Sequence, residues 1–525
     1  MTEPLVPELD SSGLVGRDAA ETARRAARLL LLLGVGWRIL RYAQNFALAP
    51  DESYVALNLM DGDWGSVLRP SRAQAAPALF LLAEKAALSV FGPSEHGLRL
   101  LPLLAGILGL VLFHRLANRA LPPLAAALAT GLLSVSYFPL RFSAEVKPYS
   151  LDLLAAVVLL DLGLRVREEP GRPRPLALLA VLAPLLIVLS YPSCLVVAAV
   201  SAVLLPAVWR QPGWRVKALF AAYNVTAFAA FLGSYLLVGV AQYRQGGEVL
   251  REFWQWHGSF PPAAPGPFVV WLLRLVTGLV FAYPLGDVTG AAALTFLLSV
   301  AGTVAIWKTG RRSVVALCLL PFAATFAVAA ARLYPFGPHA RLAQHLAAPI
   351  CLLAGAGIAA LLTFRIPPGR ALLLRTRSVF ALLAVIGVAG LAIDVLQPYR
   401  SPRDEAFRRL AAGFRSTAGP EDLVVYWQDP GDREESPSPL EFCLRKERLR
   451  FSWSSLPDLD APPRPRQVWL IAYRLPAPPE ALTKRLESAA PPFTLSGEEA
   501  HLLQVGSGPT NFVRCSVSHW RRPPS

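Results

Sequence analysis

The chain has 525 residues, of which 54% are hydrophobic and only 17% are charged, and its mean hydropathy is +0.43. These values exclude an ordinary soluble protein and indicate an integral membrane protein. The formal net charge of +15 would also suit a nucleic-acid-binding protein. However, the basic residues cluster in short loops between apolar runs, which is the pattern of cytoplasmic loops in membrane proteins. We therefore expect membrane lipids, and no nucleic acid, as partners.

The apolar runs predict about eleven membrane-spanning helices, since a span needs roughly 20 mostly apolar residues. The expected spans are 26–46, 97–116, 122–140, 149–165, 175–190, 192–209, 217–240, 288–307, 313–331, 341–363 and 373–396. With the N-terminal segment 1–25 in the cytoplasm, this number of spans puts every basic loop on the cytoplasmic side. Arg24 and Arg25 precede the first apolar run, as expected of an uncleaved anchor in the inner (plasma) membrane.

One further apolar stretch, 267–285, is not expected to cross the membrane. Arg274 interrupts it and Pro284 closes it. If it crossed, the basic loop that follows 288–307 would lie outside. We therefore expect it to lie in the interface or to re-enter the membrane.

The extracytoplasmic side collects two long loops, 47–96 and 241–287, together with several short ones and the tail. In 74–91 the apolar residues recur at helical spacing, opposite Glu84 and Lys85. Such a stripe is typical of a helix that lies flat on the membrane.

The composition changes at Pro398, after which charged residues and prolines become frequent. Strand-like runs appear at 423–427 and 467–473. Helical patterns near 437–448 and 478–488 come between or after them. This alternation predicts a small extracytoplasmic α/β domain over 397–525, following a transmembrane domain over 26–396. Cys443 and Cys515 could form a disulfide in an exported tail.

The acidic pair Asp51-Glu52 follows Pro50 in the first outer loop and precedes a helix-like stretch, 53–60. An N-cap at Asp51 with a first-turn acid would explain the pair structurally and stabilise the helix by about 1 kcal/mol. A functional explanation is a general base that takes a proton from an acceptor hydroxyl or amine at the water-facing end of the bundle. One residue can serve both roles.

Two further outer loops carry candidate site residues. The loop 141–149 contains Glu145, Lys147 and Tyr149, which an ordinary interfacial loop would also explain. The loop 332–341 contains Tyr334, His339 and Arg341. Arg341 could clamp a phosphate with both arms of its guanidinium, or it could extend toward the interface as an arginine near a helix end often does.

The remaining polar residues of the outer loops give weaker signals. Trp254 and Trp256 could stack on a sugar or anchor their loop at the interface. The chain has no closely spaced set of metal ligands and no glycine-rich phosphate motif. We therefore expect no metal and no cofactor.

Taken together, these loops resemble the superfamily of integral-membrane glycosyltransferases that use polyprenyl-phosphate sugars and have the GT-C fold. The most similar branch contains protein O-mannosyltransferases, aminoarabinose transferases and bacterial lipopolysaccharide-core glycosyltransferases. The stretches that carry the resemblance are Asp51-Glu52, 77–80 with 91–100, 143–150, and 334–337 with Arg341. They follow one another in the family's order over about residues 25–365. The segment 74–77 departs from the family, which usually has bulkier residues there.

The resemblance implies an α-helical polytopic fold and an inverting transfer from a polyprenyl-phosphate sugar to a lipid, glycan or protein acceptor. It implies that Asp51 is the catalytic base and that Glu145 or Glu84 assists it. The other residues that it implicates are Glu52 and Glu145 in catalysis, Lys147, Tyr149 and Arg341 at the donor phosphate, and Glu84, Lys85, Tyr334 and His339 at the substrates. A transporter or flippase of a lipid-linked sugar is the alternative, and a scaffold that presents the tail domain is a third possibility. A transporter is expected to have polar residues deep in several spans. In this chain the middle parts of the expected spans carry few charges, apart from Arg38, Asp152 and Asp161.

Overall fold

The computed structural model describes residues 11–522 apart from short gaps at 70–71, 73, 287–288, 338, 365–369, 399–400, 415–416, 421, 429–435, 455–458, 460–463, 476–478, 490–491 and 505–511. The chain forms two compact units. The first contains residues 1–44, 64–86 and 99–397, and the second contains residues 45–63, 87–98 and 398–525. The second unit therefore includes two segments of the first outer loop as well as the tail.

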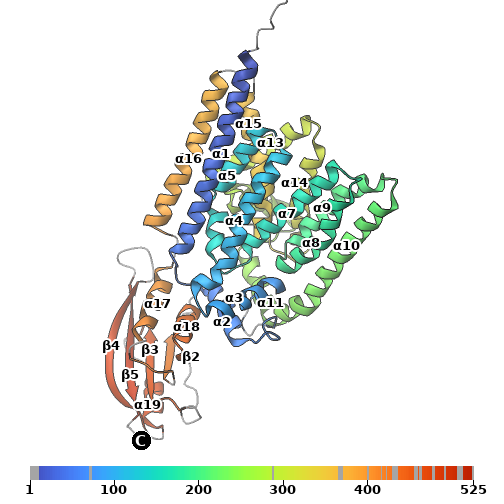
Figure 1. Cartoon of the computed structure of the whole chain (residues 1–525). Coiled ribbons are helices and arrows are strands. Elements are labelled where there is room, and N and C mark those ends of the chain that lie inside the picture. The colour runs from blue at the N-terminus through green and yellow to red at the C-terminus, as the bar shows by residue number, and fades with distance from the viewer. Residues whose placement is uncertain are drawn as a thin grey trace, which may run out of the picture. The chain divides into compact units, whose positions relative to one another are not determined.

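The first unit is a bundle of helices (Figure 1). Its longer helices are α1 (Ser11–Ala43), α4 (Glu95–Ala120), α5 (Pro123–Ser134), α7 (Tyr149–Glu168), α8 (Pro173–Leu189), α9 (Ser193–Trp209), α10 (Trp214–Ser234), α13 (Thr289–Lys308), α14 (Arg312–Ala330), α15 (Ala347–Thr363) and α16 (Arg370–Leu396). The shorter elements are α3 (Ala78–Phe91), α6 (Tyr137–Arg141), α11 (Val240–Trp256), α12 (Pro265–Thr277), the 3₁₀ segments η1 (Phe142–Ala144), η3 (Leu279–Phe281) and η4 (Ala340–Leu346), and the π-helical segment η2 (Tyr235–Gly239). Helices α3 and α4 are divided between the units.

Every expected span coincides with one or two of these helical elements, which confirms a polytopic helical membrane protein. Among the described residues, six helices are long and apolar enough to cross a membrane, or seven if the bent pair of α5 with α6 and η1 is one span. Helices α8 and α9 are apolar but have only 17 residues each. The number eleven therefore stays a prediction. Helix α12, in the stretch not expected to cross, has 13 residues, fewer than the roughly 20 that a span requires.

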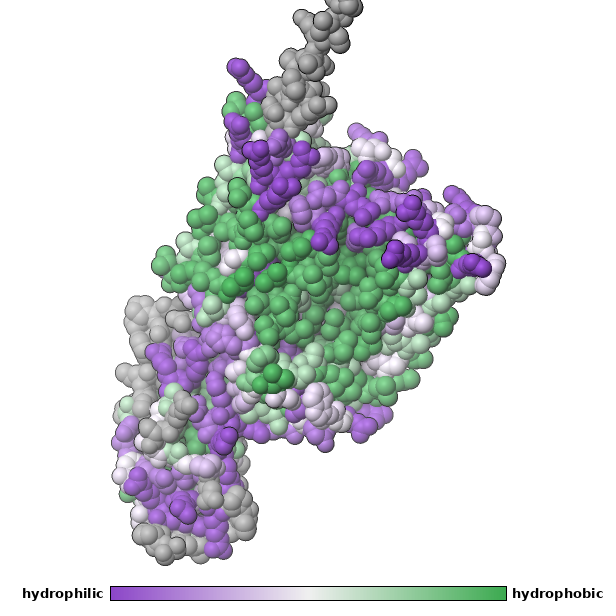
Figure 2. Space-filling model, in the orientation of Figure 1, coloured by the Kyte–Doolittle hydropathy of each residue, from purple (hydrophilic) through white to green (hydrophobic). Residues whose placement is uncertain are grey.

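On the face shown in Figure 2, the helices of the first unit present a hydrophobic band. Hydrophilic side chains gather above this band in the view. Inside the bundle, small residues allow close helix contacts. A Cβ added to Gly302 of α13 would lie 1.8 Å from the carbonyl oxygen of Leu353 on α15, and one added to Gly357 would lie 2.0 Å from that of Leu298. Such contacts stabilise membrane helices because lipid provides no hydrophobic driving force for their association.

The first and last long helices of the bundle, α1 and α16, lie side by side (Figure 1) and share a buried polar contact. The Asp394 carboxylate accepts a hydrogen bond from Trp37 Nε1 at 2.9 Å and pairs with the Arg41 guanidinium. Arg41 and Asp394 are 4% and 3% exposed, respectively. An acid buried at this depth needs such partners, because an unpaired buried charge is strongly destabilising.

The second unit is an α/β domain with a five-stranded sheet in the order β2-β1-β3-β5-β4. Its elements are α2 (Pro50–Asp61), α17 (Pro402–Phe414), β1 (Leu423–Gln428), α18 (Ser438–Lys446), β2 (Arg450–Trp453), β3 (Gln467–Tyr473), α19 (Glu480–Glu487), β4 (Thr494–Gln504) and β5 (Phe512–Arg521). Strands β2, β1 and β3 are parallel, whereas β5 and β4 pair antiparallel. The sequence-based expectation of an α/β tail is confirmed. All five cysteines are free thiols, so the disulfide considered for Cys443 and Cys515 is not formed.

A labelling experiment tests the expected side of the membrane for each unit. Glu487 is an exposed residue of α19. In a background without native cysteines, Glu487→Cys is expected to react with a membrane-impermeant maleimide in intact spheroplasts, because the basic loops place the tail outside. Arg370→Cys, at the exposed start of α16, should react only after lysis. Labelling of Glu487→Cys only after lysis would contradict the topology.

Candidate functional site

The acidic pair of the first outer loop lies at the start of α2, in the second unit. The N-cap residue is Ala49, and Pro50 and Asp51 follow it in the first turn. The Glu52 carboxylate accepts a hydrogen bond from the Ala49 backbone N–H at 2.9 Å. Glu52, 3% exposed, therefore caps the helix, and the expected cap at Asp51 is wrong. Asp51 is half-buried in the first turn, where an acidic side chain interacts favourably with the helix dipole.

Helix α2 is held by the tail within the second unit. The Ser438 hydroxyl at the start of α18 donates to the Pro50 carbonyl at 3.2 Å, and the Tyr54 hydroxyl donates to Ser436 Oγ at 2.9 Å. At the other end of the helix, Arg445 pairs with Asp61 at 2.5 Å. The turn that carries Asp51 is thus fixed by the C-terminal domain, although nearly 390 residues separate Ser438 from Pro50 in sequence.

The remaining site candidates belong to the first unit, and several of them lie in the loop before α7. The Glu145 carboxylate accepts a hydrogen bond from Arg141 Nε at 2.7 Å. Lys147 is half-buried, and its backbone N–H bonds to the Glu145 carbonyl at 2.7 Å. Tyr149 is buried and packs edge-on against Phe142, with the ring centroids 5.1 Å apart. These contacts within the loop hold Glu145, Lys147 and Tyr149, which are close together in sequence, in a defined conformation.

The loop before η4 is tied to the turn between α11 and α12. The Phe336 backbone N–H donates to the Ser259 carbonyl at 2.8 Å, and Trp271 Nε1 donates to the Gly258 carbonyl at 2.8 Å. Gly337 has a φ of 142°. This conformation favours glycine, and a Cβ at Gly337 would also lie close to the Gly258 carbonyl oxygen, at 3.3 Å.

Arg341 lies in a cluster of aromatic rings, which we call the Arg341 cluster (Trp254, His257, His339 and Arg341). Its guanidinium lies 4.9 Å from the centre of the Trp254 ring. His339 packs edge-on against both Trp254, at 5.2 Å, and His257, at 5.3 Å. Such stacking fixes a guanidinium in one orientation without neutralising its charge.

Burial, together with the charges of Arg341 and His257, lowers the pKa of His339 to about 4. His339 is therefore neutral in the folded protein at pH values where an unfolded histidine is protonated. As the pH falls, the unfolded chain takes up a proton at this histidine near pH 6.5, whereas the folded chain does so only near pH 4. The free energy of unfolding of the protein should therefore decrease as the pH falls through this interval.

We expect His339→Asn to reduce this pH dependence. The melting temperatures of the wild type and of the variant, measured from pH 7.5 to pH 4.5, should converge as the pH falls. The variant His96→Asn removes an exposed histidine outside the Arg341 cluster and serves as a control for a general effect of histidine loss. A constant difference between wild type and His339→Asn over the interval would contradict the neutral state of His339.

The two loops of the first unit meet in a common buried cluster. Phe142 and Tyr149 from the first loop pack with Ala340, which directly precedes Arg341. Tyr334 donates its hydroxyl to the Leu342 carbonyl at 3.0 Å. Burial, together with nearby groups that include Tyr149, raises the pKa of Tyr334 well above its usual value. The structure thus brings together the two loops that the sequence analysis selected separately.

Glu84 and Lys85 lie on α3. Glu84 is fully buried, and neither of its carboxylate oxygens has a hydrogen-bond partner among the described residues. Burial raises the pKa of Glu84 well above its usual value, which favours the protonated form. Lys85 is half-buried. The expected flat helix with Glu84 on its polar face is wrong in this respect, since Glu84 faces the protein interior.

Sequence reasoning missed a hydrogen-bond network between three segments of the first unit that are expected on the outer side. The Tyr191 hydroxyl donates at 2.9 Å to the Ala76 carbonyl or to Gln242 Oε1. Gln242 also donates to the Ala76 carbonyl at 2.7 Å and accepts from the Ala76 N–H at 3.2 Å. The only sign of this network in the sequence is Gln242, in the polar first turns of α11. A single glutamine that belongs to no motif does not predict a partner. The described part of the chain contains no group of three or more His, Cys, Asp or Glu side chains that could hold a metal ion.

Comparison with known proteins gives structural matches alone. No family model and no curated protein matches the sequence. The crystal structure of ArnT from Cupriavidus metallidurans bound to undecaprenyl phosphate has 15% identity and a TM-score of 0.54, and the match covers 93% of this chain and 97% of ArnT. The apo form of the same protein has 15% identity and a TM-score of 0.54, with 95% of this chain and 98% of ArnT covered. A crystal structure of the oligosaccharyltransferase from Archaeoglobus fulgidus has 13% identity and a TM-score of 0.47, covering 82% of this chain and 62% of that one.

The similarity to ArnT extends over nearly the whole of both chains, including the tail domain. At 15% identity it establishes the fold, since function depends on the site and not on the fold alone. The chain therefore has the fold of ArnT, in agreement with the polytopic helical fold that the sequence resemblance implied.

Proposed function

We propose that the protein is a glycosyltransferase that moves a hexose or pentose from a polyprenyl-phosphate donor to a lipid, glycan or protein acceptor. The observation that supports this most directly is the Arg341 cluster, in which a stacked guanidinium lies at the start of η4 beside the buried cluster of Tyr149 and Ala340. ArnT, which shares the fold, was crystallised with undecaprenyl phosphate. A cation at the outer end of membrane helices is suited to a lipid phosphate because both lie at the edge of the bilayer.

In the proposed reaction, the acceptor hydroxyl or amine attacks the anomeric carbon of the donor sugar. Asp51 removes the proton of the attacking group, and the bond between the anomeric carbon and the phosphate oxygen breaks. The polyprenyl phosphate leaves with the bonding electrons, so that the configuration at the anomeric carbon is inverted. Arg341 and Lys147 offset the negative charge of the departing phosphate.

The other candidates have supporting roles in this proposal. Glu145 accepts the hydrogen bond from Arg141 and so orients its guanidinium, and Tyr149 contributes its hydroxyl at the donor phosphate. Glu52 caps α2 and so positions Asp51. Tyr334, His339, Glu84 and Lys85 would contact the substrates or shape the site, with Glu84 acting in its protonated form.

The role of Arg341 is tested by the dependence of the rate on donor concentration. Arg341→Ala is expected to raise the apparent donor constant by about tenfold or more, since hydrogen bonds to charged groups contribute about 1.5–3 kcal/mol. Arg341→Lys should raise it less, because lysine keeps the charge but loses the planar fork. The measurement is release of polyprenyl phosphate from a polyprenyl-phosphate sugar, in detergent and with membrane acceptors.

Arg332 provides a matched control in the same loop, since it is exposed and outside the Arg341 cluster. Arg332→Ala should keep the wild-type donor constant. If the Arg341 variants also keep it, the clamp role is wrong and Lys147 becomes the candidate for the phosphate. If the wild-type protein releases no polyprenyl phosphate from any such donor, the proposed transferase activity itself is contradicted.

A further inference from the structure

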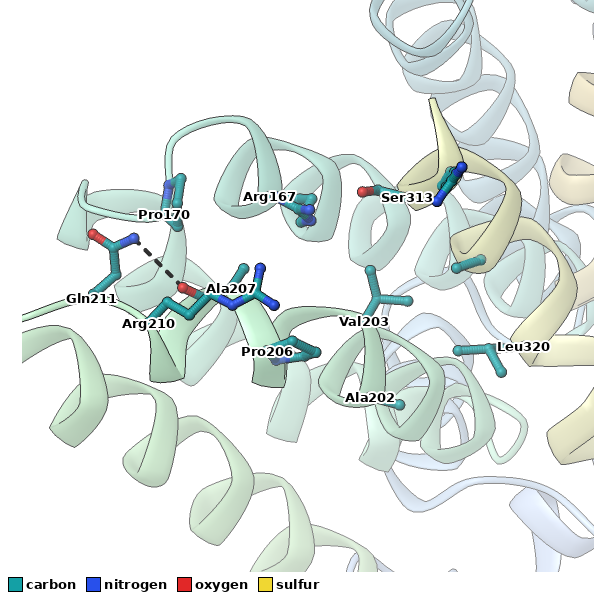
Figure 3. A pocket seen from close by; sticks show the side chains of 12 residues that line it. Arg167, Pro170, Ala202, Val203, Pro206, Ala207, Arg210, Gln211, Ser313 and Leu320 are labelled. Atoms are coloured by element: carbon teal, nitrogen blue, oxygen red, sulfur yellow. Dashed lines mark hydrogen bonds between the residues drawn. The ribbon is translucent and has the colours of Figure 1, made fainter. Parts of the chain in front are cut away.

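A second site lies in the first unit at the other end of the helices, between α7, α9 and α14. It is a cavity of about 430 Å³ whose rim carries Arg167, Arg210 and Arg312. Figure 3 shows Arg167 at the end of α7 and Arg210 just after α9, on the same side of the pocket. Helix α7 has 20 residues, and at 1.5 Å per residue it separates this pocket from Tyr149 by about 30 Å. The pocket is therefore distinct from the proposed donor site.

The pocket is positively charged, and no acidic side chain among its lining residues offsets the three arginines. The two acids that follow Arg167 are engaged by other arginines: Glu168 with Arg119 at 3.1 Å and Glu169 with Arg172 at 2.8 Å. Charge complementarity therefore favours an anionic ligand.

Below the arginines, the pocket is apolar. Its remaining walls come mainly from the facing sides of α9 and α14: Ala202, Val203, Pro206, Ala207, Ala316 and Leu320. Small residues and a proline leave space between the two helices, as the side chains in Figure 3 show. Near this end of α9, Leu205 and Trp209 are 48% and 71% exposed, which marks a surface of the membrane band.

We propose that this pocket binds an anionic phospholipid. The arginines hold the phosphate of the headgroup, and an acyl chain occupies the apolar groove between α9 and α14. A free phosphate would use the rim alone and would leave the groove without an occupant. Basic pockets between membrane helices suit anionic lipid headgroups, because the phosphate is neutralised where the apolar surface begins. The expected topology places this end of the helices at the cytoplasmic leaflet.

The test is direct binding to the purified full-length protein in a zwitterionic detergent. The probe is dioctanoyl phosphatidylglycerol, followed by isothermal calorimetry, with dioctanoyl phosphatidylcholine and inorganic phosphate as comparison ligands. We expect saturable binding of phosphatidylglycerol and none of the other two. Arg167→Gln and Arg210→Gln should each raise the dissociation constant about fivefold, given the contribution of one arginine to the attraction of an anionic lipid.

Two further variants separate the headgroup from the groove. Ala316→Leu fills the groove, keeps all three arginines, and should also weaken binding of phosphatidylglycerol. Arg375→Gln removes an exposed arginine of α16 that does not line the pocket, and it should bind like the wild type. Elution volume and melting temperature without lipid report on folding of each variant.

Three results would overturn the proposal. One is unchanged phosphatidylglycerol binding in both rim variants. Another is an effect of Arg375→Gln as large as theirs, which would indicate attraction by overall charge. The third is equal binding of inorganic phosphate, which would indicate an anion site without lipid contacts.

Discussion

Replacing Asp51 by asparagine is expected to lower the turnover number by about a hundredfold or more, the usual contribution of a general base. The amide has nearly the size of the carboxylate but cannot accept the proton of the attacking hydroxyl or amine. The structure makes this substitution informative, because the start of α2 is capped by Glu52 and not by Asp51. The helix should therefore remain intact. The measurement is the single-turnover rate at saturating donor, together with the melting temperature.

Glu52→Gln is the matched variant for this prediction. Its amide oxygen can still accept the hydrogen bond from the Ala49 N–H, so it should change the stability little, with a smaller loss of turnover than in Asp51→Asn. Near-normal turnover of Asp51→Asn at normal expression would remove Asp51 from the mechanism. A loss in Glu52→Gln as large as that in Asp51→Asn, at wild-type stability, would instead assign the base to Glu52.

Asp394→Ala is expected to destabilise the protein by about 3–5 kcal/mol, the usual effect of removing one partner of a buried ion pair. The substitution leaves Arg41, which is 4% exposed, without its carboxylate, and it also removes the acceptor of Trp37 Nε1. The contact between α1 and α16 should open first. Thermal unfolding in detergent, followed by the fluorescence of an environment-sensitive thiol dye, measures the loss.

The double variant Arg41→Met with Asp394→Leu tests the cause. It removes both charges and fills the space with apolar side chains, so it should recover most of the stability lost in Asp394→Ala. Arg25→Ala breaks the exposed pair of Arg25 with Glu21 on the same helix and should change the melting temperature little. If Asp394→Ala unfolds like the wild type, the ion pair does not hold the first and last helices together.

The sequence alone predicted that most of the chain before Pro398 is helical and apolar, and that the tail contains strands. Apolar runs of this length have one stable form in lipid, because every backbone polar group must be bonded within the segment. Strand-like runs such as 467–473 were recognisable for a related reason, since β-branched and aromatic residues bounded by prolines favour short strands. The loops that carry Glu145 and Arg341 were also selected from sequence as candidate sites, the second because arginines on the expected outer side oppose the usual charge distribution.

Only the tertiary structure decided which distant residues belong together. The attachment of α2 to α18 depends on hydrogen bonds such as that from Ser438 to Pro50, and no local pattern encodes a contact between residues so far apart. The same holds for the pairing of Asp394 with Arg41, although an acid and an arginine within apolar runs were a signal that each needed a partner. The burial of Glu84 and the cap formed by Glu52 also depend on packing and on where a helix begins. Sequence patterns fix the type of an element better than its ends or its neighbours.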